Sequence, residues 1–418
     1  IKDSSDYISF GDAMLKLESK GVSTNIASFL GATTVRIQEV GYDNRKASLE
    51  EITNMKQLVQ KSMEEGAMGI GSSLIYAPAD YASTGELIAL SKIAAEYGGM
   101  YISHIRNEDS KVLDAIDELI TISKQADIPA EIYHLKASRE ANWNLLDKMI
   151  EKVEKARAEG LKITADMYTY NASSTGLTGV IPTWVQEGGH RAWINRMQES
   201  GPRKRVIEDI RKELLQQAPE GILMVGFNKE AMAEKYMGMT IAQVAKIRNQ
   251  TPEETIVDLV IEDDSRIQCI YFSMSEDNIR KKIKLPWVSF CSDAGSFSDP
   301  SEKFRTHPRA FGSFIRVLGK YSRDEGLITL EEGIRKLTGF PAQNLGLKDR
   351  GFLKEKFYAD VIVFDPKEVR DNATFDDPIQ YAEGIEHVLV NGKQVLENGE
   401  HTGVFSGKFV KGPGYKDN

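Results

Sequence analysis

The chain has little of the chemistry on which several classes of protein depend. It contains two cysteines, Cys269 and Cys291, among 418 residues, so no disulfide framework holds the fold. No apolar run approaches the roughly 20 residues that cross a membrane, and we expect no membrane span. No glycine-rich phosphate loop follows an early strand, which argues against a nucleotide-binding sheet.

Basic residues are not concentrated either. The net charge is -9, and the 53 lysines and arginines are spread along the chain. Nucleic acids need a concentrated basic face, so we expect no nucleic-acid partner. No signal peptide is visible, but the sequence begins at Ile1 rather than Met, and we expect further residues upstream. The cytoplasm and the periplasm therefore both stay open as compartments, and the oligomeric state is undetermined.

Short apolar segments of strand length recur along the chain, several of them after Gly or Pro. They are GVSTNIASFL (21–30), GAMGIGSSL (66–74), GGMYISHI (98–105), PAEIYHLK (129–136), LKITADMY (161–168), IQCIYFSM (267–274) and PWVSFCSD (286–293). Amphipathic segments lie between them, and the pattern predicts helices at 48–65, 83–99, 111–126 and 144–160. The first of these helices begins with Ser48 and has Glu51 three residues later, which is the spacing of a capping box.

Strand and helix alternate about every 30 residues, which predicts parallel strands joined by crossover helices. We favour an α/β fold of the (β/α)8 barrel type, because polar residues that could bind a metal or take part in catalysis follow the carboxyl ends of successive strands. Residues 1–345 form the predicted barrel, and residues 176–265 break its rhythm as an insertion over its mouth. From 346 to 418, short β segments with Asn-Gly turns predict a small β-sandwich portion.

Two of the six histidines, His104 and His134, end consecutive predicted strands. In a barrel these side chains converge on one point, and neutral imidazole is a good ligand for zinc. The simpler alternative is that each is a hydrogen-bonded histidine at a strand end.

Other polar residues near predicted strand ends are further candidates. Asp293 in SFCSDAGS has the position of a general base, although a turn-forming Asp is the alternative. Arg309 in THPRAFGSF suits a substrate carboxylate, or else it begins a helix. Lys136 shares the strand face of His134, and Tyr168 and Ser174 are placed to donate hydrogen bonds or to line the rim. We expect Cys291 to be a packed thiol.

Six segments of the chain together resemble the D-aminoacylase (N-acyl-D-amino-acid deacylase) family of the amidohydrolases. They contain SHIRNE (103–108), YHLK (133–136), ADMYTYNASSTGLT (165–178), SFCSDAGS (289–296), HPRAFG (307–312) and LTGFPAQNLGL (337–347). The joint occurrence of SHIRNE, YHLK, SD and HPRAFG is far more specific than any one of them. The likeness runs from about residue 20 to 410.

The resemblance implies a zinc-dependent hydrolase with one or two metal ions, acting on a small-molecule N-acyl-D-amino acid. It implies that His104 and His134 are zinc ligands and that Asp293 is the catalytic aspartate. It also implies that Arg309 binds the substrate carboxylate, and that polar residues of the substrate pocket are Tyr76, Lys136, Tyr168 and Ser174.

One departure from the family pattern is clear. The family has a His-x-His pair on its first barrel strand and a further ligand, often Cys, on the next; this chain has no His-x-His and no Cys before residue 269. We therefore expect the first barrel strands to be missing from this sequence, and the polypeptide alone not to be fully active. Two alternatives stay open: a cyclic-amide hydrolase of the hydantoinase or dihydropyrimidinase kind, and a catalytically impaired barrel that serves as a binding protein.

Overall fold

The computed structural model describes residues 8–296 and 305–417. A five-stranded parallel sheet lies at its centre, with the strands in sequence order. The strands are β1 (Leu30–Gly31), β2 (Gly69–Ser73), β3 (Met100–His104), β4 (Ala130–Ile132) and β5 (Ile163–Ala165). A parallel bridge from Ala165 to Val288 continues the sheet into the predicted strand at 286–293.

Helices connect the parallel strands and cover their outer side. They are α2 (Ala32–Glu39), α3 (Leu49–Glu64), α4 (Thr84–Glu96), α5 (Val112–Ala126) and α6 (Leu146–Ala158), and a further helix, α1 (Phe10–Ser19), precedes β1. The four helices predicted between residues 48 and 160 are present as α3 to α6. Ser48 and Glu51 form the predicted capping box of α3, which satisfies backbone donors at the start of that helix.

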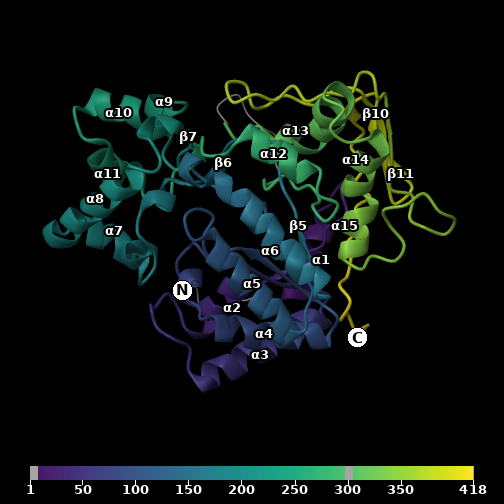
Figure 1. Cartoon of the computed structure of the whole chain (residues 1–418), viewed down its shortest axis with the longest axis horizontal. Helices are drawn as coiled ribbons and strands as arrows, with labels where there is room; N and C mark the ends of the chain where they lie inside the picture. The colour runs from purple at the N-terminus through teal and green to yellow at the C-terminus, as the bar shows by residue number, and fades with distance from the viewer. Residues whose placement is uncertain (1–7, 297–304, 418) are drawn as a thin grey trace.

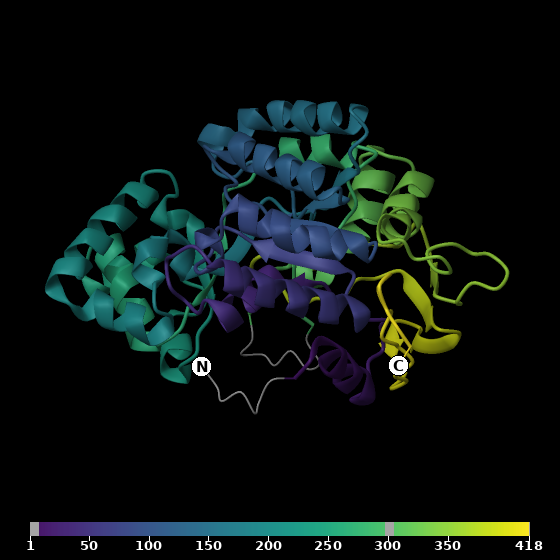
Figure 2. The ribbon, with the colours of Figure 1, turned by 90° about the horizontal axis from the view of Figure 1, so that it is seen from below.

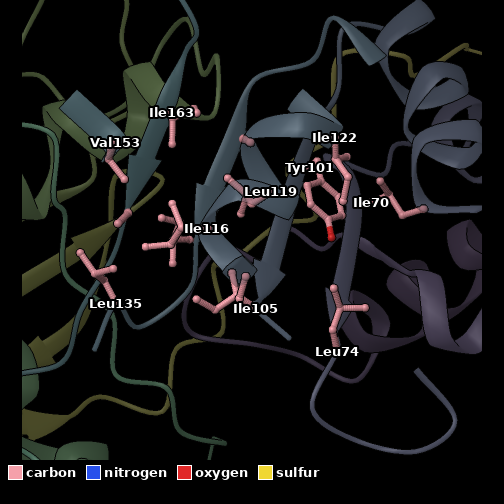
Figure 3. Close-up of a cluster of buried hydrophobic side chains, with 14 of the residues drawn as sticks. Ile70, Leu74, Tyr101, Ile105, Ile116, Leu119, Ile122, Leu135, Val153 and Ile163 are labelled. Carbon is pink, nitrogen blue, oxygen red and sulfur yellow. The ribbon is translucent and has the colours of Figure 1, made fainter. Parts of the chain in front are cut away.

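The main core lies between the strands and these helices. Figure 3 shows Ile70, Tyr101 and Ile163 of the strands near Ile116, Leu119 and Ile122 of α5, all buried. Burial of each large apolar side chain contributes roughly 1.5–3 kcal/mol. The strand residues that alternate with them, among them Glu131 and Thr164, face the opposite side of the sheet. Polar side chains are thus gathered on the inner side.

An inserted module follows β5 and has its own sheet and core. Its antiparallel sheet has the order β6-β8-β7, and its own hydrophobic cluster lies among residues 177–271. The elements are β6 (Ser173–Gly176), β7 (Ile222–Gly226), β8 (Gln268–Tyr271), α7 (His190–Gln198), α8 (Ser200–Leu214), α9 (Glu230–Tyr236), α10 (Ile241–Arg248) and α11 (Pro252–Asp263). The expectation of a parallel strand at 267–274 is wrong, because β8 pairs antiparallel with both neighbours.

The chain then returns to the barrel and ends in a second antiparallel sheet. The returning helices are α12 (Glu276–Ile283), α13 (Arg309–Arg316), the π-helical segment η7 (Val317–Asp324), α14 (Leu330–Leu337) and α15 (Gly339–Asn344). The C-terminal sheet has the order β12-β11-β10-β9, from β9 (Val361–Phe364), β10 (Ile385–Val390), β11 (Lys393–Glu397) and β12 (Glu400–His401). Asn391 and Gly392 both have positive φ, as the predicted Asn-Gly hairpin turn requires.

The inserted module and the C-terminal sheet lie on opposite sides of the parallel sheet. Figures 1 and 2 show α7 to α11 grouped at one end of the molecule and β10 and β11 at the other. Short 3-10 helices occur in the connections: η2 (Ala79–Tyr81), η3 (Glu140–Leu145), η4 (Leu177–Val180), η5 (Thr183–Gln186) and η6 (Pro219–Gly221). Among the described residues, none of the helices is long and apolar enough to span a bilayer.

A buried ion pair joins two of the covering helices and yields a test of the fold. Arg36 of α2 is 0% exposed and its Nη1 lies 2.6 Å from Oε2 of Glu86 of α4. Loss of one partner from a buried pair leaves an uncompensated charge and costs about 3–5 kcal/mol. We expect Arg36→Met to lower the urea midpoint of unfolding strongly, and the double change Arg36→Met with Glu86→Leu to recover part of it. A double variant no more stable than Arg36→Met alone would contradict this.

Candidate metal and active site

A cavity of about 870 Å³ opens where the carboxyl ends of the parallel strands meet the inserted module. Its walls come from the segments after β2, β3 and β4, from β6 and η4, and from α8. Seven of the eight predicted site residues line it: Tyr76, His104, His134, Lys136, Tyr168, Ser174 and Asp293. In a parallel α/β fold, polar residues at the strand ends meet at one edge, and here they share one hollow.

The two predicted ligand histidines lie next to each other. His104 ends β3 and His134 follows β4, and their ring centroids are 4.4 Å apart. Glu108 joins them: ligand atoms of His104, Glu108 and His134 all lie within 4.8 Å of one another. Two imidazoles and one carboxylate are a donor set suited to zinc.

The protonation of this cluster also suits a cation. Burial lowers the pKa of His104 to about 3, so its imidazole is neutral at pH 7. Nε2 of His104 is buried and has no hydrogen-bond partner among the described residues, although a carboxylate oxygen of Glu108 lies 3.6 Å away. Burial alone would raise the pKa of Glu108, but His104, Lys136 and His134 together lower it well below its usual value. The residues present therefore fit a divalent metal ion.

Lys136 touches the same cluster. Its Nζ lies 2.6 Å from Oε1 of Glu108 and 2.7 Å from Nδ1 of His134, and its side chain is 3% exposed. Nδ1 of His134 is also 3.1 Å from Oε1 of Glu108. One carboxylate thus faces an ammonium group and two imidazoles at once.

His134 is held in an unusual backbone conformation. Its φ is +37°, in the left-handed region that non-glycine residues rarely adopt. Its N–H donates to Oδ1 of Asp166 at 2.5 Å, and the N–H of Leu135 donates to the backbone carbonyl of Asp166 at 2.9 Å. The segment after β5 thereby fixes the turn that carries His134.

Asp293 and Arg309 form an ion pair beside the cavity. Nη1 of Arg309 donates to Oδ2 of Asp293 at 2.5 Å, and the guanidinium lies 4.6 Å from the ring centroid of Tyr168. Asp293 is one-third exposed and has φ of +48°, whereas Arg309 is 6% exposed at the start of α13. Arg309 is the one predicted site residue that does not line the cavity; it contacts two residues that do.

The remaining predicted residues surround the cluster. The ring of Tyr76 is tilted by 59° against that of His104, with ring centroids 5.3 Å apart, and its hydroxyl lies 2.8 Å from Oγ1 of Thr175. Burial raises the pKa of Tyr168 well above its usual value, so its hydroxyl keeps its proton. Ser174 donates to the carbonyl of Cys269 at 2.9 Å, so its hydroxyl is already engaged within the inserted sheet. Burial likewise raises the pKa of Cys291, which favours a packed thiol over a ligand.

Sequence reasoning missed Glu108 and Asp166. Glu108 stands four residues after His104 in SHIRNE, so the signal was present in a segment already singled out. Asp166 directly follows β5 and resembles many acidic residues that end strands. Its contact with the His134 N–H depends on a backbone turn that residue types alone do not reveal.

Comparison with known proteins places this site in a family. The model of the amidohydrolase family matches residues 32–396. An N-acyl-D-glutamate deacylase of Alcaligenes xylosoxydans xylosoxydans is 32% identical over 380 residues, which are 91% of this chain and 68% of that protein.

Two solved structures are similar over most of the chain. One is a D-aminoacylase described for its binuclear metal center, with 29% identity, a TM-score of 0.80, and coverage of 96% of this chain and 75% of that chain. The other is an N-acyl-D-glutamate deacylase of Bordetella bronchiseptica complexed with zinc and a phosphonate inhibitor, with 27% identity, a TM-score of 0.80 and the same coverage. They confirm the expected α/β barrel architecture, and the chain belongs to the amidohydrolase family.

Proposed function

We propose that this chain carries the metal and substrate residues of a zinc-dependent deacylase that hydrolyses the amide bond of N-acyl-D-amino acids. The products are a carboxylate and a free D-amino acid. The observation that carries the proposal is the cluster of His104, Glu108 and His134 inside a cavity that Asp293 also lines. The names of the relatives support the substrate class, and the zinc in one of them supports the metal. The binuclear center of another leaves room for one or two ions.

The residues of the cluster would hold the metal. His104 and His134 would offer imidazole nitrogens, that of His104 neutral at pH 7, and Glu108 is the nearest carboxylate. A bound zinc ion would polarise the amide carbonyl and acidify water.

We place the division of the chain at 345, with the barrel and its insertion at about 176–265 before it, and the β-sandwich portion after it.

Asp293 is the proposed general base and acid. Its carboxylate accepts the proton that leaves the attacking water and then delivers that proton to the departing amide nitrogen. Arg309 donates a hydrogen bond to it at 2.5 Å and orients the carboxylate. Tyr168 lines the same cavity and its hydroxyl stays protonated at neutral pH, so it is the proposed donor to the developing oxyanion, in place of its present contact with the sulfur of Met274.

Arg309 and Lys136 are the proposed partners of the substrate α-carboxylate. Arg309 is planar and fixed by its contact with Tyr168, which suits bidentate binding. By fixing the carboxylate, these cations help decide which enantiomer presents its amide to water. The relatives reported above are named for D-aminoacylase or N-acyl-D-glutamate deacylase activity. No feature of the described site favours a cyclic amide over these linear amides.

Removal of a predicted ligand tests the metal site. We expect His104→Ala to lower the zinc content of the purified protein to below one-tenth of the wild-type value, because it removes a buried neutral nitrogen that has no hydrogen-bond partner among the described residues. Zinc is measured by elemental analysis after dialysis. His190→Ala, which changes an exposed histidine of the inserted module, is the matched control. Equal zinc in His104→Ala and the control would exclude His104 as a ligand.

Replacement of the general base tests the proton transfer. We expect Asp293→Asn to reduce kcat for N-acetyl-D-glutamate by about 10²–10⁴-fold while zinc content stays unchanged, because the amide cannot accept the proton. Turnover is followed by release of the D-amino acid. Turnover close to that of the wild type would refute the role of Asp293.

Removal of the guanidinium tests substrate anchoring. We expect Arg309→Ala to raise KM for N-acetyl-D-glutamate by about 30-fold or more, which corresponds to a lost charged hydrogen bond of about 2–3 kcal/mol. The carboxamide analogue of the substrate, which lacks the α-carboxylate, should be affected far less. If both compounds lose affinity equally, Arg309 acts through Asp293 alone and does not bind the carboxylate.

A further inference from the structure

Lys282 is a buried lysine that the proposed reaction does not use. It lies in the last turn of α12, its side chain is 1% exposed, and it is surrounded by the barrel core. Burial of an ammonium group is costly unless the group has a defined partner. Burial first, and the nearby charge of Lys136 second, lower the pKa of Lys282 to about 7. A lysine at such a position needs a structural reason.

The one hydrogen-bond partner of Lys282 in the described part of the chain is a carbonyl oxygen of the site. Its Nζ donates to the backbone carbonyl of Leu135 at 2.5 Å. Leu135 stands between His134 and Lys136, the two residues of β4's carboxyl end that contact Glu108. Lys282 therefore holds the peptide between them.

The segment that Lys282 contacts is strained and fixed from two other directions. The φ of His134 is +37°, and Asp166 accepts the N–H of His134 and of Leu135. The side chain of Leu135 is 1% exposed in the core, below Val153 and Ile116 in Figure 3. The N–H and the side chain of Leu135 are therefore already held in place. Its carbonyl is the remaining group that can anchor this turn, and Lys282 donates a hydrogen bond to it. A strained turn persists where its surroundings fix it in this way.

We propose that Lys282 is a positioning residue that keeps the His134–Lys136 turn in the conformation that presents both side chains to Glu108. This inference rests on the proposed function, because it assigns Lys282 a role in holding the metal and substrate residues. Lys282 acts through the Leu135 peptide and touches neither the substrate nor the metal. Its removal should therefore weaken zinc binding and substrate binding together.

The chain offers a matched control in Lys336 of α14. Lys336 is 0% exposed, and its Nζ donates to the carbonyls of Ile283 and Leu285 at 2.5 and 2.7 Å. Both lysines are buried and both satisfy backbone carbonyls. Only Lys282 contacts the turn at the site. The loss of stability that follows from removing any buried lysine should appear when either lysine is replaced. A loss of zinc and substrate binding should appear only when Lys282 is replaced.

The experiment compares Lys282→Met with Lys336→Met in the full chain. We expect both to lower the thermal midpoint of unfolding. We expect only Lys282→Met to raise the Kd for zinc, measured by chelator competition, by about 10- to 100-fold, the usual effect of losing a group that orients a metal ligand. KM for N-acetyl-D-glutamate should rise in Lys282→Met when zinc is saturating. Equal zinc Kd and KM values in the two variants would overturn the inference.

A second pair keeps the test decisive if a methionine variant does not fold. Glutamine retains a neutral donor, so Lys282→Gln should weaken zinc binding less than methionine does, and still more than Lys336→Gln. Equal zinc binding in Lys282→Gln and Lys336→Gln would also overturn the proposal.

The wild-type protein separates the proposed function from the role of Lys282: if it binds no zinc and hydrolyses no N-acyl-D-amino acid, the proposed function fails. If it does both and the pairs behave alike, only the role of Lys282 fails.

Discussion

The carboxylate of Glu108 is the interaction on which the arrangement of the site depends. It is 2.6 Å from the ammonium of Lys136 and 3.1 Å from Nδ1 of His134, and His104 lies on its other side. Without a negative charge here, a buried lysine and two imidazoles would face one another with no carboxylate between them. Because a buried charge is stable only when it is paired, the carboxylate and the side chains around it fix one another's positions.

The backbone around this carboxylate is arranged by residues that never reach the cavity. Asp166 accepts two N–H groups of the turn after β4, those of His134 and Leu135, and Lys282 donates to the carbonyl of Leu135. The side chains of the same region continue into the main core through Leu135. The geometry of the site is thus tied to the packing of the barrel, because the turn that carries His134 and Lys136 is anchored in the core through Leu135.

The strand and helix pattern was readable from the sequence because local signals and tertiary packing agree there. The capping box of Ser48 and Glu51 correctly predicted the start of α3, and the apolar runs at 66–74 and 98–105 contain β2 and β3. The segment at 267–274 has the same apolar character, yet β8 pairs antiparallel in the inserted sheet. The sequence of an apolar strand does not show whether its neighbours run parallel or antiparallel to it. The sheet that it joins is decided by contacts with residues far away in sequence. Phe409, in the C-terminal portion for which short β segments were predicted, likewise makes an isolated bridge to Ile26, far away in sequence.

The residues of the candidate site likewise include some that could be predicted from the sequence and some that could not. His104 and His134 could be found because each ends an apolar strand, and consecutive parallel strands end at one edge. Glu108 was missed although it stands in SHIRNE, and Lys282 could not be found, because its importance lies in what it contacts rather than in its position within a motif. A helical lysine reads as a solvated surface residue until the structure places it beneath a strained turn. Candidate metal ligands at strand ends are therefore easier to recognise in a sequence than the residues that fix the backbone around them.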